Sequence, residues 1–104
     1  MIEELNREHR YLIKVLIRGP RNVSYLYDRF LNKCAVWISP DDDEESPFDA
    51  RVTRTFNETI ESLIDRGLVT VHEHKRGQNL ELTEQGKNAA DEIRAFLEAA
   101  RAFI

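Results

Sequence analysis

The hydrophobic pattern of this sequence changes its period at Gly67, and this change limits the fold more than any other feature. Before the glycine, apolar residues between positions 47 and 66 recur three and four apart, as on one face of a helix. After it, residues 68–74 are rich in side chains that favour strands, and Leu80-Glu81-Leu82 alternates as a returning strand. The intervening segment Lys75–Asn79 has the composition of a turn. The sequence therefore predicts a helix followed by a β-hairpin with a charged tip.

Three more helices are predicted around this unit. The first runs from about Ile2 to Arg18, has one apolar face and is stopped by Gly19-Pro20. The second runs from an N-cap at Asn22 to about Cys34, and residues 35–38 either extend it or form a short strand. The last covers about Glu84 to Phe103. The order helix, helix, helix, hairpin, helix is a mainly α (α+β) arrangement.

Length and composition predict one domain over residues 1–104. A chain of 104 residues has the size of a single domain, and 41% hydrophobic residues supports a packed core. No apolar run is long enough to span a bilayer, and the first residues do not read as a signal peptide. With Cys34 as its only cysteine, the chain is expected to be cytoplasmic and without internal disulfides.

The net charge of −4 does not by itself favour a nucleic-acid partner. Five of the negative charges belong to the run Asp41–Glu45, so the remainder carries −4 + 5 = +1. We expect residues 39–46 to form a solvated acidic loop between the second and third helices.

Two segments carry a family resemblance. The run Thr55–Val69, which ends in Leu63-Ile64-Asp65-Arg66-Gly67-Leu68-Val69, resembles the recognition helix and the first wing strand of winged helix-turn-helix proteins. The run Leu80–Lys87 resembles the passage from a wing strand into a C-terminal helix. Together they are similar to the MarR and PadR types of prokaryotic transcription regulator, with some similarity to the winged-helix domain of archaeal replication initiators. The resemblance covers most of the chain and is strongest over Val52–Lys87.

This resemblance implies that the third helix enters the major groove of duplex DNA and that the hairpin tip, the wing, meets the backbone or the minor groove. Arginine can pair with guanine there and asparagine with adenine, while lysine and arginine bind phosphates. The DNA-binding residues implied are Arg51, Arg54, Thr55, Asn57, Glu58, Lys75, Arg76 and Gln78. Further backbone contacts are expected from Arg18, Arg21, Arg29 and Lys33.

The last helix has an apolar stripe that reaches its C-terminal end, formed by Ile93, Phe96, Leu97, Ala100 and Phe103. A small three-helix core is not expected to cover such a stripe, and an exposed apolar stripe usually finds a partner. We therefore predict that residues 84–104 form a dimerisation helix in a homodimer. The alternative is that this helix folds back on residues 5–16 of its own chain.

The remaining polar residues do not predict catalysis, a metal or a cofactor. His72 and His74 share one strand face, but a metal site would need a third ligand from His9, Cys34 or the acidic loop, and exposed wing histidines are the better interpretation. Phosphate-binding, hydrolase and metalloprotease motifs are all missing from the sequence, which argues against an enzyme. Cys34 reads as a buried apolar residue.

The sequence thus favours a dimeric, sequence-specific, double-stranded DNA-binding regulator of transcription from a prokaryote or its virus. Two alternatives stay open. The first is a winged helix that serves as a protein-interaction module, with the acidic loop contacting a basic partner. The second is a plasmid or viral replication or partition factor, which would bind DNA through the same chemistry.

Overall fold

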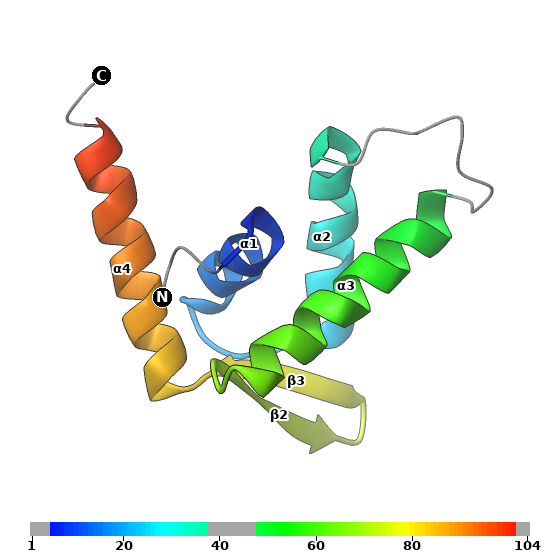
Figure 1. The fold of residues 1–104 in the computed structure, drawn as a ribbon. Helices are drawn as coiled ribbons and strands as arrows, with labels where there is room; N and C mark the ends of the chain where they lie inside the picture. Colours follow the sequence, from blue (N-terminus) through cyan, green and yellow to red (C-terminus); the bar gives the residue numbers. More distant parts are fainter. Residues whose placement is uncertain (1–4, 38–47, 102–104) are drawn as a thin grey trace.

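The computed structural model describes residues 5–37 and 48–101, and its elements follow one another in the predicted order with one additional strand (Figure 1). The acidic loop, residues 39–46, lies outside the described residues. The elements are α1 (Arg7–Leu16), β1 (Arg21–Asn22), α2 (Val23–Trp37), α3 (Phe48–Asp65), β2 (Val69–His74), β3 (Gly77–Leu82) and α4 (Glu84–Arg101). The mainly helical fold class predicted from the sequence is confirmed.

The sheet has three antiparallel strands in the order β1-β3-β2 rather than the two predicted. The added strand β1 consists of two residues, and its Arg21 pairs with Leu80. The hairpin turn is also tighter than predicted, because His74 already pairs with Gly77 and Gln78 pairs with Glu73 inside the ladder. Only residues 75–76 remain for the turn itself.

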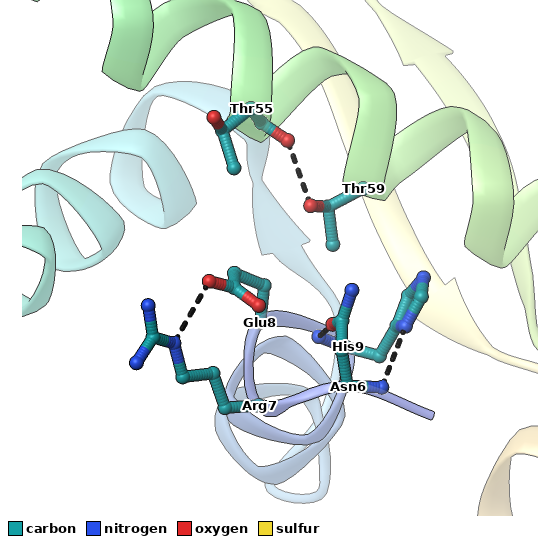
Figure 2. Close-up of polar contacts among 6 residues, drawn as sticks. All are labelled: Asn6, Arg7, Glu8, His9, Thr55 and Thr59. Carbon is teal, nitrogen blue, oxygen red and sulfur yellow. Dashed lines mark hydrogen bonds and ion pairs between the residues drawn. The ribbon is translucent and has the colours of Figure 1, made fainter. Parts of the chain in front are cut away.

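The start of α1 is held by a capping box. The Asn6 side chain accepts a hydrogen bond from the backbone N–H of His9 at 2.8 Å, and His9 Nδ1 accepts one from the backbone N–H of Asn6 at 3.1 Å (Figure 2). This reciprocal pair satisfies two N–H groups that a helix start leaves unpaired. The helix therefore begins at Arg7 among the described residues, later than predicted, and it ends two residues before the predicted Arg18.

Asn22 precedes α2, as predicted for its cap, and its Oδ1 accepts a hydrogen bond from the backbone N–H of Ser24 at 2.8 Å. The open question at residues 35–38 is answered as far as Trp37, because the backbone continues α2 to that residue. The helix α3 then covers Phe48–Asp65, close to the predicted span.

Gly67 ends α3 in the way that its sequence position suggested. Its φ of +72° is a left-handed conformation that glycine adopts without a steric penalty. Its N–H donates to the carbonyl of Ile64, and the N–H of Leu68 donates to the carbonyl of Leu63, both at 3.0 Å. These two bonds form a Schellman motif, which turns the chain directly from α3 into β2.

Thr83 joins the hairpin to α4. Its hydroxyl donates to the carbonyl of Gly67 at 2.6 Å and accepts from the N–H of Gly86 at 3.0 Å, while its own N–H donates to the carbonyl of Leu68. Gly86 lies so close to Leu68 that an added Cβ would collide with the carbonyl oxygen of that residue. Hydrogen bonding thus explains the threonine in the segment Leu82–Lys87, and close packing explains the glycine.

The core lies between the helices and one face of the sheet. Phe56 of α3 makes edge-to-face contacts with Phe30 and Tyr27 of α2, each with a centroid distance of 5.3 Å. Leu12 of α1 and Leu80 of β3 are fully buried in the same cluster. The helix α4 packs against α1 and β3 rather than against α2 (Figure 1).

Within residues 5–37 and 48–101, no helix has the length and apolarity that a membrane crossing requires.

Candidate nucleic-acid interface

One side of α3 faces solvent and carries polar side chains at helical spacing. Arg54, Asn57 and Glu58 are exposed there, and they line one shallow hollow together with Thr53 and Glu61. Their spacing follows from the helix, because the apolar residues at positions 52, 56 and 63 take the opposite side. The structure therefore brings three of the five predicted α3 residues onto one surface.

Arg51 does not belong to this surface. Arg51 is only 8% exposed, so it packs among the buried residues instead of lying on the exposed face with Arg54. Its burial gives no support to the predicted DNA contact, which stays a prediction. Thr55 is half-buried, and its carbonyl accepts a hydrogen bond from the Thr59 hydroxyl at 2.7 Å on the side of α3 that faces the start of α1 (Figure 2). Thr55 thus lies at the edge of the exposed face.

The charge on the exposed face of α3 is not basic. Arg54 is the one cation lining the hollow, and Glu58 and Glu61 line the same hollow. Such a face suits hydrogen bonding to base edges better than binding to phosphates, since carboxylates repel phosphate and can accept from cytosine. Phosphate contacts would have to come from other elements.

The wing tip supplies exposed cations. Lys75 and Arg76 occupy the two-residue turn and line a hollow with His74, Asn79 and Asn22. Asn22 comes from β1, and its Nδ2 lies 3.4 Å from the Oδ1 of Asn79. This hydrogen bond links the wing to β1, the unpredicted strand that directly precedes α2.

Gln78 is exposed on β3 rather than in the turn, and its side chain donates to the carboxylate of Glu73 at 3.4 Å. His72 lies within 3.2 Å of the carboxylate of Glu81 and within 3.3 Å of the Thr70 hydroxyl. Both wing histidines are exposed. Over the described residues, histidine, cysteine and carboxylate side chains form no group of three that could hold a metal ion.

The predicted dimer residues separate into two groups along α4. Ile93 is 7% exposed and packs into the core, so it is not available to a partner. Phe96 and Leu97 are 62% and 47% exposed, and Ala100 is also exposed. Phe103 lies outside the described residues. The alternative that α4 packs against α1 of its own chain agrees with the structure (Figure 1), whereas the dimer stays a prediction that the exposed residues of α4 leave open.

A groove of about 400 Å³ separates α1 from α4 beside the exposed residues. Its apolar lining includes Ile17, which is 38% exposed, and Leu97, and its polar rim contains Lys14, Arg18, Arg94 and Glu98.

Sequence reasoning missed several residues of these surfaces. Asn22 was expected only to cap a helix, yet it also lines the wing hollow. Thr53 lines the α3 hollow, and its hydroxyl lies 2.9 Å from that of Tyr27 on α2. A helical projection of residues 50–61 would have placed Thr53 beside Asn57, whereas the pairing of β1 with β3 left no signal in a two-residue strand.

No protein-family model and no curated protein matches this sequence. Solved structures match it in fold. The adhesin competence repressor AdcR of Streptococcus pyogenes has a TM-score of 0.62 at 17% identity, over 97% of this chain and 64% of its own. A mutant of Lactococcus lactis ZitR has a TM-score of 0.65 at 14% identity, over 95% of this chain and 57% of its own. An ArsR family transcriptional regulator has a TM-score of 0.51 at 20% identity, over 94% of this chain and 78% of its own.

The chain spans less than two thirds of the lengths of AdcR and ZitR. Two of the three matched proteins are described by their names as a repressor and a transcriptional regulator. At these identities the matches bear on the fold, and they agree with the helices, the sheet order and the hairpin described above. The chain has the winged helix-turn-helix fold of these transcriptional regulators, as its resemblance over Val52–Lys87 predicted.

Proposed function

We propose that this chain binds duplex DNA in a sequence-specific manner and regulates transcription. The observation that carries the proposal is the winged-helix fold, with Arg54, Asn57 and Glu58 together on the exposed face of α3 and Lys75 and Arg76 at the wing tip. A helix of this kind fits the major groove, and its arginine and asparagine have the donors and acceptors that distinguish guanine and adenine. The wing cations are suited to phosphates.

The proposed regulator works as a homodimer. Phe96 and Leu97 are exposed on α4, and Leu97 lines the α1–α4 groove with the exposed Ile17, so a second copy would bury this apolar surface. A two-fold dimer would carry two α3 helices, which is the number that two half-sites require. We also propose that the protein is cytoplasmic and of prokaryotic source, as the sequence analysis expects.

Variants of α3 and of the wing should affect DNA binding differently. Asn57→Ala should reduce the preference for the selected duplex over a scrambled one, by about 1–3 kcal/mol if Asn57 pairs with a base. Lys75→Ala with Arg76→Ala should weaken binding to both duplexes alike and lower the slope of log affinity against log salt by about 2.

Fluorescence anisotropy over a salt series measures both effects. Lys87→Ala is the matched control, because Lys87 is exposed on α4 and lines neither hollow. If the wing variant bound both duplexes as tightly as the control did, the wing would have no part in DNA binding. A winged helix used as a protein-interaction module would then be the better reading.

A further inference from the structure

A cleft of about 270 Å³ between α1, β1 and α2 collects cations and aromatic rings, and it is distinct from the hollows of α3 and the wing tip. It lies on a different side of α2 from α3, because Tyr25 and Arg29 line it whereas Tyr27 contacts Phe56 of α3. We call it the basic cleft. Its polar lining consists of Tyr11, Lys14, Arg18, Arg21, Tyr25 and Arg29.

Two guanidinium groups share one ring in the basic cleft. The guanidinium carbon of Arg21 lies 5.6 Å from the centroid of the Tyr25 ring, and that of Arg29 lies 5.7 Å from the same centroid. Both are within the range of a cation–π interaction. The ring therefore holds two like charges at one wall of the cleft, while their N–H groups keep their capacity to donate hydrogen bonds.

Carboxylates do not neutralise these charges in the described part of the chain. No acidic side chain lines the basic cleft. Within residues 5–37 and 48–101, Arg18, Arg21 and Arg29 form no ion pair with a carboxylate. Four cations around a concave site, with no counter-charge in its lining, produce a positive potential that the low-dielectric walls strengthen. The site is thus complementary to an anion with several acceptor oxygens.

We propose that the basic cleft binds a phosphate group through Arg21 and Arg29, with Lys14 and Arg18 at its rim. Arginine forks match the oxygens of a phosphate in geometry as well as charge. Two sources of that group fit the surroundings: the backbone of duplex DNA, and a free phosphorylated small molecule. The phosphate site itself does not depend on the proposed function. Only the first source, the backbone of duplex DNA, rests on that function.

Each source has its own structural support. Arg21 is followed by Asn22, which lines the hollow under the wing tip, so a DNA backbone on the wing could continue along β1 into the basic cleft. On the other side, Lys14 and Arg18 line both the basic cleft and the α1–α4 groove. A free phosphorylated ligand would therefore bind cations that also border the proposed dimer surface.

The test is a titration of the full chain with inorganic pyrophosphate at low salt, followed by NMR of its backbone and arginine side-chain N–H groups. The proposal predicts saturable shifts centred on Arg21, Tyr25 and Arg29. Arg21→Gln with Arg29→Gln should weaken binding at least about tenfold, since each lost charge-assisted bond is worth that much. Lys87→Gln, an exposed lysine elsewhere, should leave the affinity unchanged.

Shifts spread evenly over all exposed cations, or equal affinities in both variants, would overturn the proposal. Unchanged thermal unfolding of the double variant shows that its effect is not a loss of fold. Adding the selected duplex then separates the sources: competition with pyrophosphate at the basic cleft identifies the DNA backbone, and simultaneous binding identifies a free ligand. Pyrophosphate binding at this cleft without any duplex binding would support the site while contradicting the proposed function.

Discussion

His9 closes the start of α1 and ties that helix to α3 with the same ring. Its Nδ1 accepts from the backbone N–H of Asn6, and its Nε2 lies 2.9 Å from the hydroxyl of Ser62 (Figure 2 shows the first of these contacts). A neutral ring with its proton on Nε2 satisfies both contacts. Burial lowers the pKa of His9, the positive charge of Arg66 lowers it further, and Glu8 opposes them.

The fold should therefore lose stability through His9 as the pH falls. The unfolded chain takes up a proton near the ordinary histidine pKa of about 6.5, whereas the folded chain does so only at lower pH. The unfolded state thus binds more protons between the two values, so the contribution of His9 is complete above about pH 6.5 and declines below it.

His9→Gln removes this titration, and glutamine at the same helix position can still bond back to the cap. Urea unfolding at pH 7.5 and pH 5.5 checks the expectation. The free energy of unfolding should fall more for the wild type than for the variant. Equal decreases would show that other groups, and not His9, govern the acid sensitivity.

Arg51 and Arg54 differ in burial although the sequence predicts the same role for both. Arg51 and Arg54 are one turn apart, and composition alone gives both the same role. Only the packing around α3 separates them, because Arg51 is buried and Arg54 is exposed. Arg51→Ala should lower the free energy of unfolding by about 1–3 kcal/mol, while Arg54→Ala should change it by less than about 0.5 kcal/mol. Thermal or urea unfolding of the two variants measures this, and similar values for both would contradict the assignment of Arg51 to the fold.

At the scale of elements, the junction between the wing and α4 depends on Gly86. Alanine normally favours a helix over glycine by about 1 kcal/mol. Here the added Cβ would meet the backbone of Leu68, which is fixed by its bond to Thr83, and also the side chain of Leu82. Gly86→Ala should therefore destabilise the chain by about 1–3 kcal/mol.

Asn88→Ala, at an exposed position of the same helix, provides the control and should be neutral or slightly stabilising. Differential scanning calorimetry compares the two variants. If Gly86→Ala raised the melting temperature as much as the control, the predicted collision of a Cβ at position 86 with Leu68 would be contradicted.

Much of the fold could be predicted from the sequence because long periodic segments and their end signals are local. Gly67 and the Thr83–Gly86 segment marked both ends of the hairpin, and the helices have the predicted order. The two-residue strand β1 could not be predicted, since it exists only through its pairing with β3. The candidate site was predicted in part: Arg54, Asn57 and the turn residues are exposed as expected, but the burial of Arg51 depends on tertiary packing.

The proposed homodimer depends on the exposed apolar side chains in the second half of α4. Phe96→Glu with Leu97→Glu places two charges in the exposed apolar area of α4 and should convert a dimer to a monomer, since burying charges without partners is costly. Ala95→Glu is the control, because Ala95 is exposed on the opposite side of the helix from Leu97. Light scattering after size-exclusion chromatography gives the mass. A wild-type chain that is a monomer at high concentration would refute the dimer.

The proposed function requires that this winged helix bind duplex DNA and distinguish its sequence. The most direct measurement is selection of duplexes from a random pool, followed by fluorescence anisotropy of the selected and a scrambled duplex at about 50 mM and 200 mM salt. We expect the selected duplex to bind more tightly than the scrambled one, and the affinity for both to fall steeply with salt. Failure of any duplex to bind at low salt, or equal binding of selected and scrambled sequences, would contradict it.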